Sequence, residues 1–313
     1  MISDLIGKDE RFQEILERLN RKSVEDYYNP YQTFNWPESL PADQWWMSPE
    51  LTTTHGTEIA DELDQETLHR LSRCESINFY SLNVDGIRDL IVEVTRRIHT
   101  RGFEVPSEFF HHFIGEENEH MWFFAEFCQR YGGKIYPQVA PAGEGDEWPE
   151  AASFLVFVRI LLFEELVDHF NSTMAADEQL HETIRAVNRI HHQDESRHIA
   201  FGRELVSILF EDLKSKATEE QLREVQEYIK RYLNYSFESL FNPQVYRDAG
   251  IPEPHAVRRR LLASPRTREF QRRVLRKPVN FLVKTGILPD RELTPSGNPA
   301  GNPAGTAGAE GAT

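Results

Sequence analysis

The sequence has few thiols and no long apolar run. Among its 313 residues only Cys74 and Cys128 are cysteines. Two isolated thiols make neither a disulfide framework nor a thiolate zinc site, and they favour a reducing compartment. No apolar run reaches about 18 residues, so no transmembrane helix is expected. The first residues also lack the basic and then apolar pattern of a secretory signal, and we therefore expect a cytoplasmic protein.

Positive charge is also scarce. The 35 Lys and Arg residues face 51 Asp and Glu residues, which gives a formal net charge of −16. Such an acidic chain repels phosphate backbones, so a nucleic-acid partner is not expected. Hydrophobic residues make up 39% of the chain, with 20 Phe, 10 Tyr and 5 Trp, which excludes global disorder. The chain has twelve His but only two Cys, so imidazoles greatly outnumber thiols among its potential metal ligands.

Apolar residues recur at helical spacing along most of the chain, and strand-like alternation is scarce. Helix breakers separate the apolar segments at Pro106, at the Gly132-Gly133 pair and along residues 137–149. This pattern predicts an all-α fold, a four-helix bundle with extra N- and C-terminal helices. An aromatic-rich arm at 26–50 is expected to pack against the helices. The expected helices span residues 9–21, 64–100, 107–131, 150–175, 178–214, 218–242 and 266–286.

The chain is expected to form one helical domain over residues 1–290, with its bundle core at about 64–215. The basic segment near its end is interpreted as a docked helix rather than a membrane anchor. From residue 291 the sequence is rich in Pro, Gly, Asn and Ala, so residues 291–313 are predicted to be a low-complexity, disordered tail.

The pattern Glu-x-x-His occurs five times. A chain of this composition contains roughly two acidic-x-x-His pairs by chance, so no single pair is informative by itself. The direction in which each pair points on its helix decides which pairs are candidate ligands, because positions i, i+3 and i+4 share a face. The five pairs are Glu66/His69, Glu108/His111, Glu117/His120, Glu178/His181 and Glu195/His198.

One pair in the second bundle helix should face the core. Glu117 and His120 lie on the stripe that also carries Phe113 and Phe124. Glu108 lies nine residues before Glu117, so it points about 180° away and is expected to be solvated. The second bundle helix therefore contributes one inward pair.

The fourth bundle helix contributes another inward Glu-x-x-His pair. His191, Glu195 and His198 are spaced by four and three residues and form one continuous stripe. Glu178 lies 17 residues before Glu195, about 25 Å along a helix axis, so it cannot join the same site. The pair that starts at Glu66 lies at a helix entrance, where a capping or surface role is expected.

A lone Glu in the third bundle helix supplies a further carboxylate. Glu164 lies on the core stripe of Val156, Ile160 and Val167, whereas Glu165 is turned about 100° away. A buried carboxylate without a compensating group would cost several kcal/mol. Glu164 therefore needs a partner in the interior.

Three inward Glu and three inward His on three helices predict bound cations. Carboxylate oxygens with imidazole nitrogens suit iron or manganese, and the absence of thiolates argues against structural zinc. Two divalent ions would nearly balance the three carboxylates. Hydrogen-bonded Glu–His pairs without a metal remain the alternative. The six inward groups are Glu117, His120, Glu164, His191, Glu195 and His198.

These motifs carry a resemblance to a known family. Two Glu-x-x-His helices with a lone inward Glu resemble the ferritin-like di-iron carboxylate proteins. The pattern His191-x-x-x-Glu195-x-x-His198, the segment 110–120 and the following Tyr-Gly-Gly are similar to the p-aminobenzoate N-oxygenase family over about residues 65–215. The resemblance implies two iron ions, O2 as co-substrate and an external electron donor. It implies as iron ligands, and through the metal as catalytic residues, Glu117, His120, Glu164, His191, Glu195 and His198.

The resemblance implies a non-haem di-iron monooxygenase. The expected reaction is N-oxygenation of a small-molecule amine, in specialised metabolism, to a hydroxylamine, nitroso or nitro product. The alternatives are a di-iron C–H hydroxylase or desaturase acting on an acyl or amino-acid substrate, and a protein that stores iron. An electron-donor protein and a homodimer stay open as partners. The inward aromatics Phe113, Phe124 and Phe163 are candidates for the substrate pocket.

One position departs from the family pattern. The family's first bundle helix also supplies a Glu, but the inward stripe of this chain carries Ile87 there. Asp85 and Asp89 are near in sequence but turn away from the stripe. Either the helix is irregular at Gly86 so that Asp85 or Asp89 turns in, or one iron has fewer protein ligands.

Two charged residues flank the predicted ligands on the fourth bundle helix, Asp194 and Arg197. Asp194 could accept a hydrogen bond from a ligand His and fix its tautomer. A position on the surface is the alternative for both residues.

Overall fold

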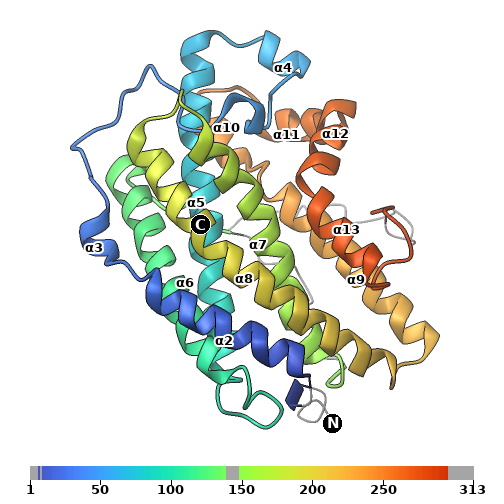
Figure 1. The fold of residues 1–313 in the computed structure, drawn as a ribbon. Helices are drawn as coiled ribbons and strands as arrows, with labels where there is room; N and C mark the ends of the chain where they lie inside the picture. Colours follow the sequence, from blue (N-terminus) through green and yellow to red (C-terminus); the bar gives the residue numbers. More distant parts are fainter. Residues whose placement is uncertain (1–5, 8, 139–147, 295–313) are drawn as a thin grey trace, which may run out of the picture.

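The computed structural model describes residues 6–7, 9–138 and 148–294. The regular secondary structure of these residues is helical, and they contain no strand. Four long helices run side by side as a bundle (Figure 1). The most extensive contacts pair α7 with α8 and α5 with α6, while α5 and α7 meet over a short length only. The all-α prediction is therefore confirmed. The bundle helices are α5 (Gln65–Thr95), α6 (Ser107–Phe127), α7 (Ala152–Ala176) and α8 (Glu182–Lys214).

Polar side chains cap the first turn of two bundle helices, α5 and α8. The Asp64 side chain accepts from the backbone N–H of Thr67 at the start of α5. At the start of α8, the His181 side chain accepts from the backbone N–H of Thr183. The predicted start of this helix at residue 178 is wrong, because the Asp177 side chain and carbonyl bind the next backbone N–H groups in a separate turn.

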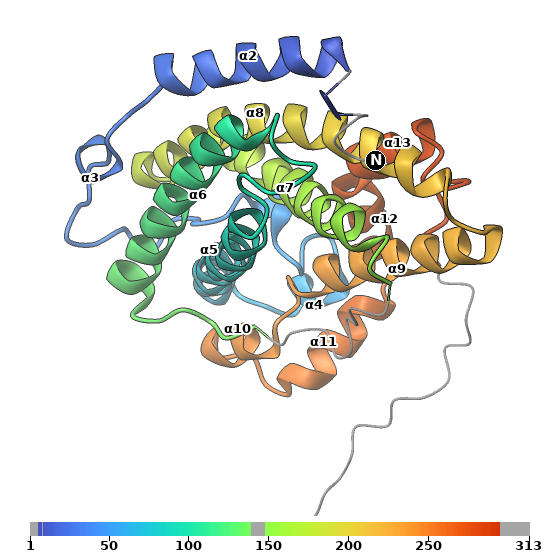
Figure 2. The ribbon, with the colours of Figure 1, turned by 90° about the horizontal axis from the view of Figure 1, so that it is seen from below.

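Additional helices cover the bundle. The helix α2 (Glu10–Glu25) lies across α6 and α8, and α9 (Glu219–Glu238) lies along α7 (Figure 2). The C-terminal segment 266–286 is not one helix as predicted. It divides at Leu275, because Pro278 has no N–H to donate to the carbonyl four residues earlier. The remaining elements are α3 (Pro30–Thr33), η1 (Pro49–Leu51), α4 (Glu58–Asp61), η2 (Cys128–Gly132), α10 (Pro243–Asp248), α11 (Pro254–Ala263), α12 (Pro265–Val274) and α13 (Arg276–Lys284).

The aromatic arm packs against α6, as predicted. The Phe34 ring lies edge-on to Phe123, with 5.1 Å between the ring centroids. Trp46 is buried against Phe127, and its indole N–H donates to the carbonyl of Pro41 at 2.9 Å. The arm therefore seals one side of the bundle with large apolar surfaces.

The C-terminal helices are docked on the bundle. Leu282 of α13 is fully buried, and α13 contacts α7. Within the described residues, no helix is both long and apolar enough to cross a membrane. Of the predicted tail, residues 295–313 lie outside the described residues, so the tail and the single-domain division stay predictions.

Candidate metal centre

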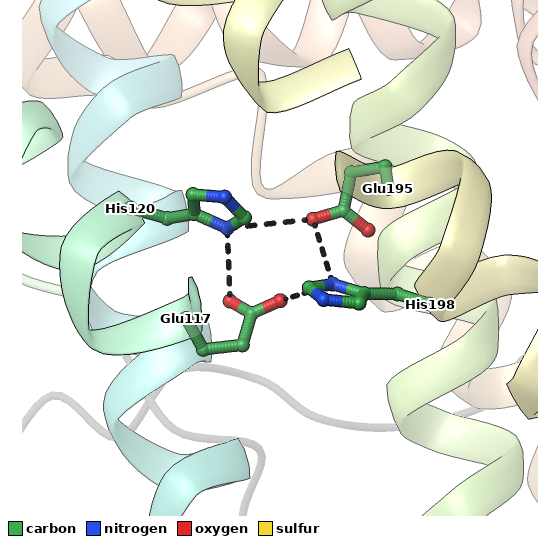
Figure 3. Close-up of side chains that lie close together, drawn as sticks. All are labelled: Glu117, His120, Glu195 and His198. Carbon is green, nitrogen blue, oxygen red and sulfur yellow. Dashed lines mark ion pairs between the residues drawn. The ribbon is translucent and has the colours of Figure 1, made fainter. Parts of the chain in front are cut away.

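The two inward Glu-x-x-His pairs meet in the bundle interior (Figure 3). Glu117 and His120 come from α6, and Glu195 and His198 come from α8; each is at most 1% exposed. One candidate ligand atom from each residue lies within 4.8 Å of those of the other three. The Nδ1 atom of His198 is 2.8 Å from Glu117 Oε1 and 3.5 Å from Glu195 Oε1. The four side chains thus form a compact oxygen and nitrogen cluster.

His191 joins this cluster from the preceding turn of α8. Its Nε2 atom lies 3.0 Å from Glu195 Oε1, and its ring centroid is 4.5 Å from that of His120. The side chain is buried. The spacing predicted from the sequence therefore places a third imidazole beside the cluster.

Glu164 brings a carboxylate from α7. It is 2% exposed, and neither of its oxygens has a hydrogen-bond partner. Burial, and then the charge of Glu195, raise the pKa of its carboxyl well above the ordinary value. The neighbouring Glu165 is buried too, but both of its oxygens accept from Arg203, at 2.8 and 2.9 Å. Of these two adjacent carboxylates, only Glu165 is compensated by protein groups.

Protons balance the carboxylates of the cluster. Burial alone would lower the pKa of His120, but its hydrogen bond to Asp194 and the nearby carboxylate of Glu117 raise it to about 10. Burial would raise the pKa of Glu117, yet the neighbouring imidazoles of His120 and His198 hold it below its ordinary value. Bound cations could replace these protons as the compensating charge, because imidazole binds a metal in its neutral form.

Asp194 orients one of the imidazoles. It is buried, and its Oδ2 atom accepts from Nε2 of His120 at 2.9 Å. Arg197 donates to Asp194 Oδ1 at 2.6 Å, and the Tyr28 hydroxyl donates to Asp194 Oδ2 at 3.2 Å. The predicted hydrogen bond from a candidate ligand His to Asp194 is confirmed. It leaves Nδ1 of His120 facing the cluster.

The other two imidazoles have similar outer partners, which the sequence analysis missed. Glu116 Oε2 accepts from Nε2 of His198 at 2.8 Å, and the side-chain amide of Asn171 contacts Nδ1 of His191. Arg197 also donates to Glu116, at 2.9 Å. The available signal for Glu116 was its position directly before a ligand candidate, as for Asp194.

The α5 helix contributes no carboxylate to this cluster. Asp85 pairs with Arg88, and Asp89 is exposed, while α5 runs unbroken past both. The alternative in which one of these aspartates turns in is therefore wrong. Ile87 is buried as predicted. The sequence analysis missed Asn83, which is 0% exposed and whose Oδ1 atom has no hydrogen-bond partner.

The other Glu-x-x-His pairs do not join the cluster. Glu66 is exposed in the first turn of α5 and pairs with Arg70 at 3.2 Å. Glu108 is exposed on α6, and Glu178 is exposed before α8 begins. The choice made from helical geometry is thus confirmed for all three.

Two of the three aromatic candidates line the cluster. The Phe113 ring centroid is 4.5 Å from that of His198, and the Phe124 centroid is 4.8 Å from that of His191. Phe163 is only half-buried and faces a groove between α5 and α7, so its inward placement was wrong. The turn of about 100° between successive helical residues separates it from Glu164.

A four-helix bundle that brings two Glu-x-x-His motifs together beside a further buried Glu and His defines a ferritin-like carboxylate protein of the di-iron type. Residues 9–286 match the family model of the p-aminobenzoate N-oxygenase AurF, and the chain belongs to this family. The enzymes of the family are di-iron N-oxygenases, a class of oxidoreductase. No curated protein matches the chain.

Proposed function

We propose that this chain binds two iron ions in the interior of the bundle and uses O2 to oxygenate the nitrogen of a small-molecule amine. The observation that carries the proposal is the cluster of buried acids and imidazoles, which contains no Lys or Arg side chain. Glu164 supports it most directly, because its two oxygens have no hydrogen-bond partner. Such a group is costly unless a cation or proton compensates it.

The donor set fits iron. Carboxylate oxygens and imidazole nitrogens suit iron and manganese, whereas thiolates would indicate a zinc or iron–sulfur site. Of the two cysteines, Cys128 is buried against Ser81 and the Ile77 carbonyl, and Cys74 is half-buried on α5. We assign the two metals to Glu117, His120, Glu164, His191, Glu195 and His198.

The surrounding residues hold the ligands and exclude water. Asp194 and Glu116 bind the outer nitrogens of His120 and His198, which fixes the rings and keeps their inner nitrogens toward the metals. Phe113 and the neighbouring aromatic rings form an apolar lining around the imidazoles. Bound iron would supply the electrons and the Lewis acidity with which O2 is reduced.

The overall reaction needs an external reductant. One oxygen atom of O2 is transferred to the amine nitrogen, and the other leaves as water after taking up two protons and two electrons. An electron donor, either a small molecule or a second protein, supplies these electrons in each cycle. The substrate is expected to be a small organic amine.

The test is metal loading followed by product analysis. The full chain is incubated anaerobically with ferrous salt, and iron and protein are measured after gel filtration. We expect two iron ions per chain, a transient visible absorption after exposure to O2, and amine products that have gained oxygen at nitrogen. A colourless protein without stoichiometric iron would contradict the proposal.

The same experiment separates the alternatives. Stoichiometric iron with products oxygenated only at carbon, from a panel of acyl and amino-acid substrates, would indicate a hydroxylase or desaturase. Many irons per chain would indicate storage. The Glu108→Gln variant is the matched control, because it changes an exposed Glu-x-x-His pair on the same helix α6.

A further inference from the structure

A groove of about 800 Å³ lies between α5, α7 and α9. Its volume is within the range of sites that hold small organic molecules. The helices α5 and α7 meet over a short length only, whereas α7 with α8 and α5 with α6 are extensively packed, so the groove follows one of the sparsely packed seams of the bundle. The side chains of α5 and α7 that form the apolar part of the groove are Leu82, Leu90, Val92, Val156, Ile160 and Phe163.

The charges around the groove balance. Its acidic residues on α5 face an equal number of arginines, and two ion pairs connect them, Asp85 with Arg88 and Glu93 with Arg96. Because the charges cancel, the groove favours neither an anion nor a cation as a whole. The apolar part favours an uncharged apolar body, since burying a charge there is costly. The acidic residues are Asp85, Asp89 and Glu93, and the arginines are Arg88, Arg96 and Arg159.

At the groove, an aromatic ring fills the seam between α5 and α7. Phe163 of α7 packs against Gly86 of α5 so closely that a Cβ atom at Gly86 would come 2.6 Å from the ring. Gly86 has no side chain, so the ring takes the space that one would fill. The contact at this level is thus made by the tip of a side chain, which can rotate, rather than by two packed backbones.

The residues that follow Phe163 and Gly86 in the sequence are buried. Glu164, the next residue of α7, is turned into the interior, and Ile87, the next residue of α5, is buried. Phe163 itself is half-buried and lines the groove. The groove-lining Phe163 and the unpartnered carboxylate of Glu164 are therefore on adjacent residues of α7.

We propose that this groove is the access route and holding site for the substrate, and that the Phe163 ring is its gate. Rotation of the ring away from Gly86 opens the seam beside Glu164, and its return closes the centre against water. The occupant is a small organic molecule with an uncharged, flat, apolar body. This inference rests on the proposed function, because it assumes that the Glu–His cluster is the reacting centre.

The first arm of the test needs no iron. An uncharged fluorescent aromatic amine, N-phenyl-1-naphthylamine, is titrated into the metal-free full chain. We expect saturable binding at one site that is weakened at least tenfold in Ile160→Glu, which places a charge in the apolar part of the groove. The matched control is Ile208→Glu, a half-buried Ile of α8 outside the groove. Equal affinity in both variants would overturn the groove as the binding site.

The second arm measures access to the loaded centre. Azide binding to the oxidised, iron-loaded chain is followed in a stopped-flow instrument by its charge-transfer absorption. We expect Phe163→Ala to speed association about tenfold and Phe163→Trp to slow it, with unchanged iron content. Phe281→Ala, a half-buried Phe outside the groove, is the control.

The Gly86→Ala variant keeps the test decisive if the loss of Phe163 impairs folding. Its new methyl group would displace the ring from its present place, so azide association should accelerate as in Phe163→Ala. Association rates that are the same in all these variants, at two irons per chain, would overturn the gate and leave the proposed function intact. A chain that holds no iron would instead overturn the proposed function, and the inference with it.

Discussion

The two halves of the bundle interior are built differently. The α6–α8 half carries two Glu-x-x-His motifs whose four side chains contact one another, and its imidazoles are held by outer hydrogen bonds. The α5–α7 half offers Glu164 without a hydrogen-bond partner, the neutral Asn83 and the apolar Ile87. It also borders the groove. The paired motif therefore fixes the centre, and the sparser half leaves room for access.

This difference predicts unequal effects of substitution. A ligand in the α6–α8 half contacts several others, so its loss disturbs the whole cluster. A ligand in the α5–α7 half is less connected, and its loss should affect one metal position. Iron stoichiometry distinguishes the two cases.

The largest effect is expected for Glu195→Gln. Glu195 contacts His191, His120 and His198, so it is central to the cluster. We expect iron binding to fall below one ion per chain and product formation to fall by more than about 100-fold, beyond what loss of an outer partner costs. Iron analysis and turnover measure this, with Glu108→Gln as control. Two tightly bound irons in Glu195→Gln would contradict the assignment.

Glu164→Gln should have a more selective effect. It removes the only carboxylate that α7 directs into the cluster, so we expect one iron to be retained and the other lost. The neighbouring Glu165→Gln weakens the ion pair between the buried Glu165 and the partly exposed Arg203 instead. It should lower the free energy of unfolding by roughly 1 kcal/mol, because solvent screens the exposed partner, without changing the iron content. If both variants behave alike, Glu164 has no special role.

Asp194→Asn tests the outer hydrogen bonds of the α6–α8 half. Asp194 accepts from His120 and from Arg197, and it is buried with both. Losing its charge should weaken iron binding by about 10- to 100-fold, as is usual for groups that orient a metal-binding imidazole. Competition with a chelator measures the affinity. An unchanged affinity would show that the bundle alone holds the ring.

Asn83→Asp tests the α5–α7 half by placing a carboxylate on the buried face of α5, four residues before Ile87. We expect a gain of about tenfold in affinity for the second iron, because a charged oxygen ligand suits this metal better than an amide. Asn83→Leu, of similar size, should give a small loss. If the Asp variant loses stability and gains no affinity, its carboxylate is buried away from the metals.

The α6–α8 half was the more predictable from sequence. Its ligands repeat at i, i+3 and i+4, so helical geometry alone selected Glu117 and Glu195 from five similar pairs. Asn83 and Glu116 could not be selected in the same way. A neutral Asn on an apolar stripe does not have the buried charge that marks a candidate metal ligand. The role of Glu116 depends on its hydrogen bond with His198, which lies on another helix. The same limit applies to Phe163, whose position depends on how α5 and α7 meet.

Glu75 is a buried carboxyl that needs no metal, and it sharpens the comparison with Glu164. Glu75 lies in the N-terminal half of α5. Its carboxylate accepts hydrogen bonds from the backbone N–H and the hydroxyl of Thr53. Burial raises its pKa to about 8, although the bonds from Thr53 act in the opposite direction. Glu75→Gln should therefore leave the iron content unchanged.

The same variant makes a prediction about pH. Because the pKa of Glu75 is higher in the folded protein than its ordinary value of 4.5, its contribution to stability is complete below that value. The contribution is lost as the pH rises through about 8. Relative to Glu75→Gln, the wild-type free energy of unfolding should fall by roughly 3.5 kcal/mol between about pH 5 and pH 8. Urea denaturation of the metal-free chains measures this difference. A difference that does not change with pH would mean that Glu75 is ionised in the folded chain, and that burial alone does not explain the raised pKa of Glu164.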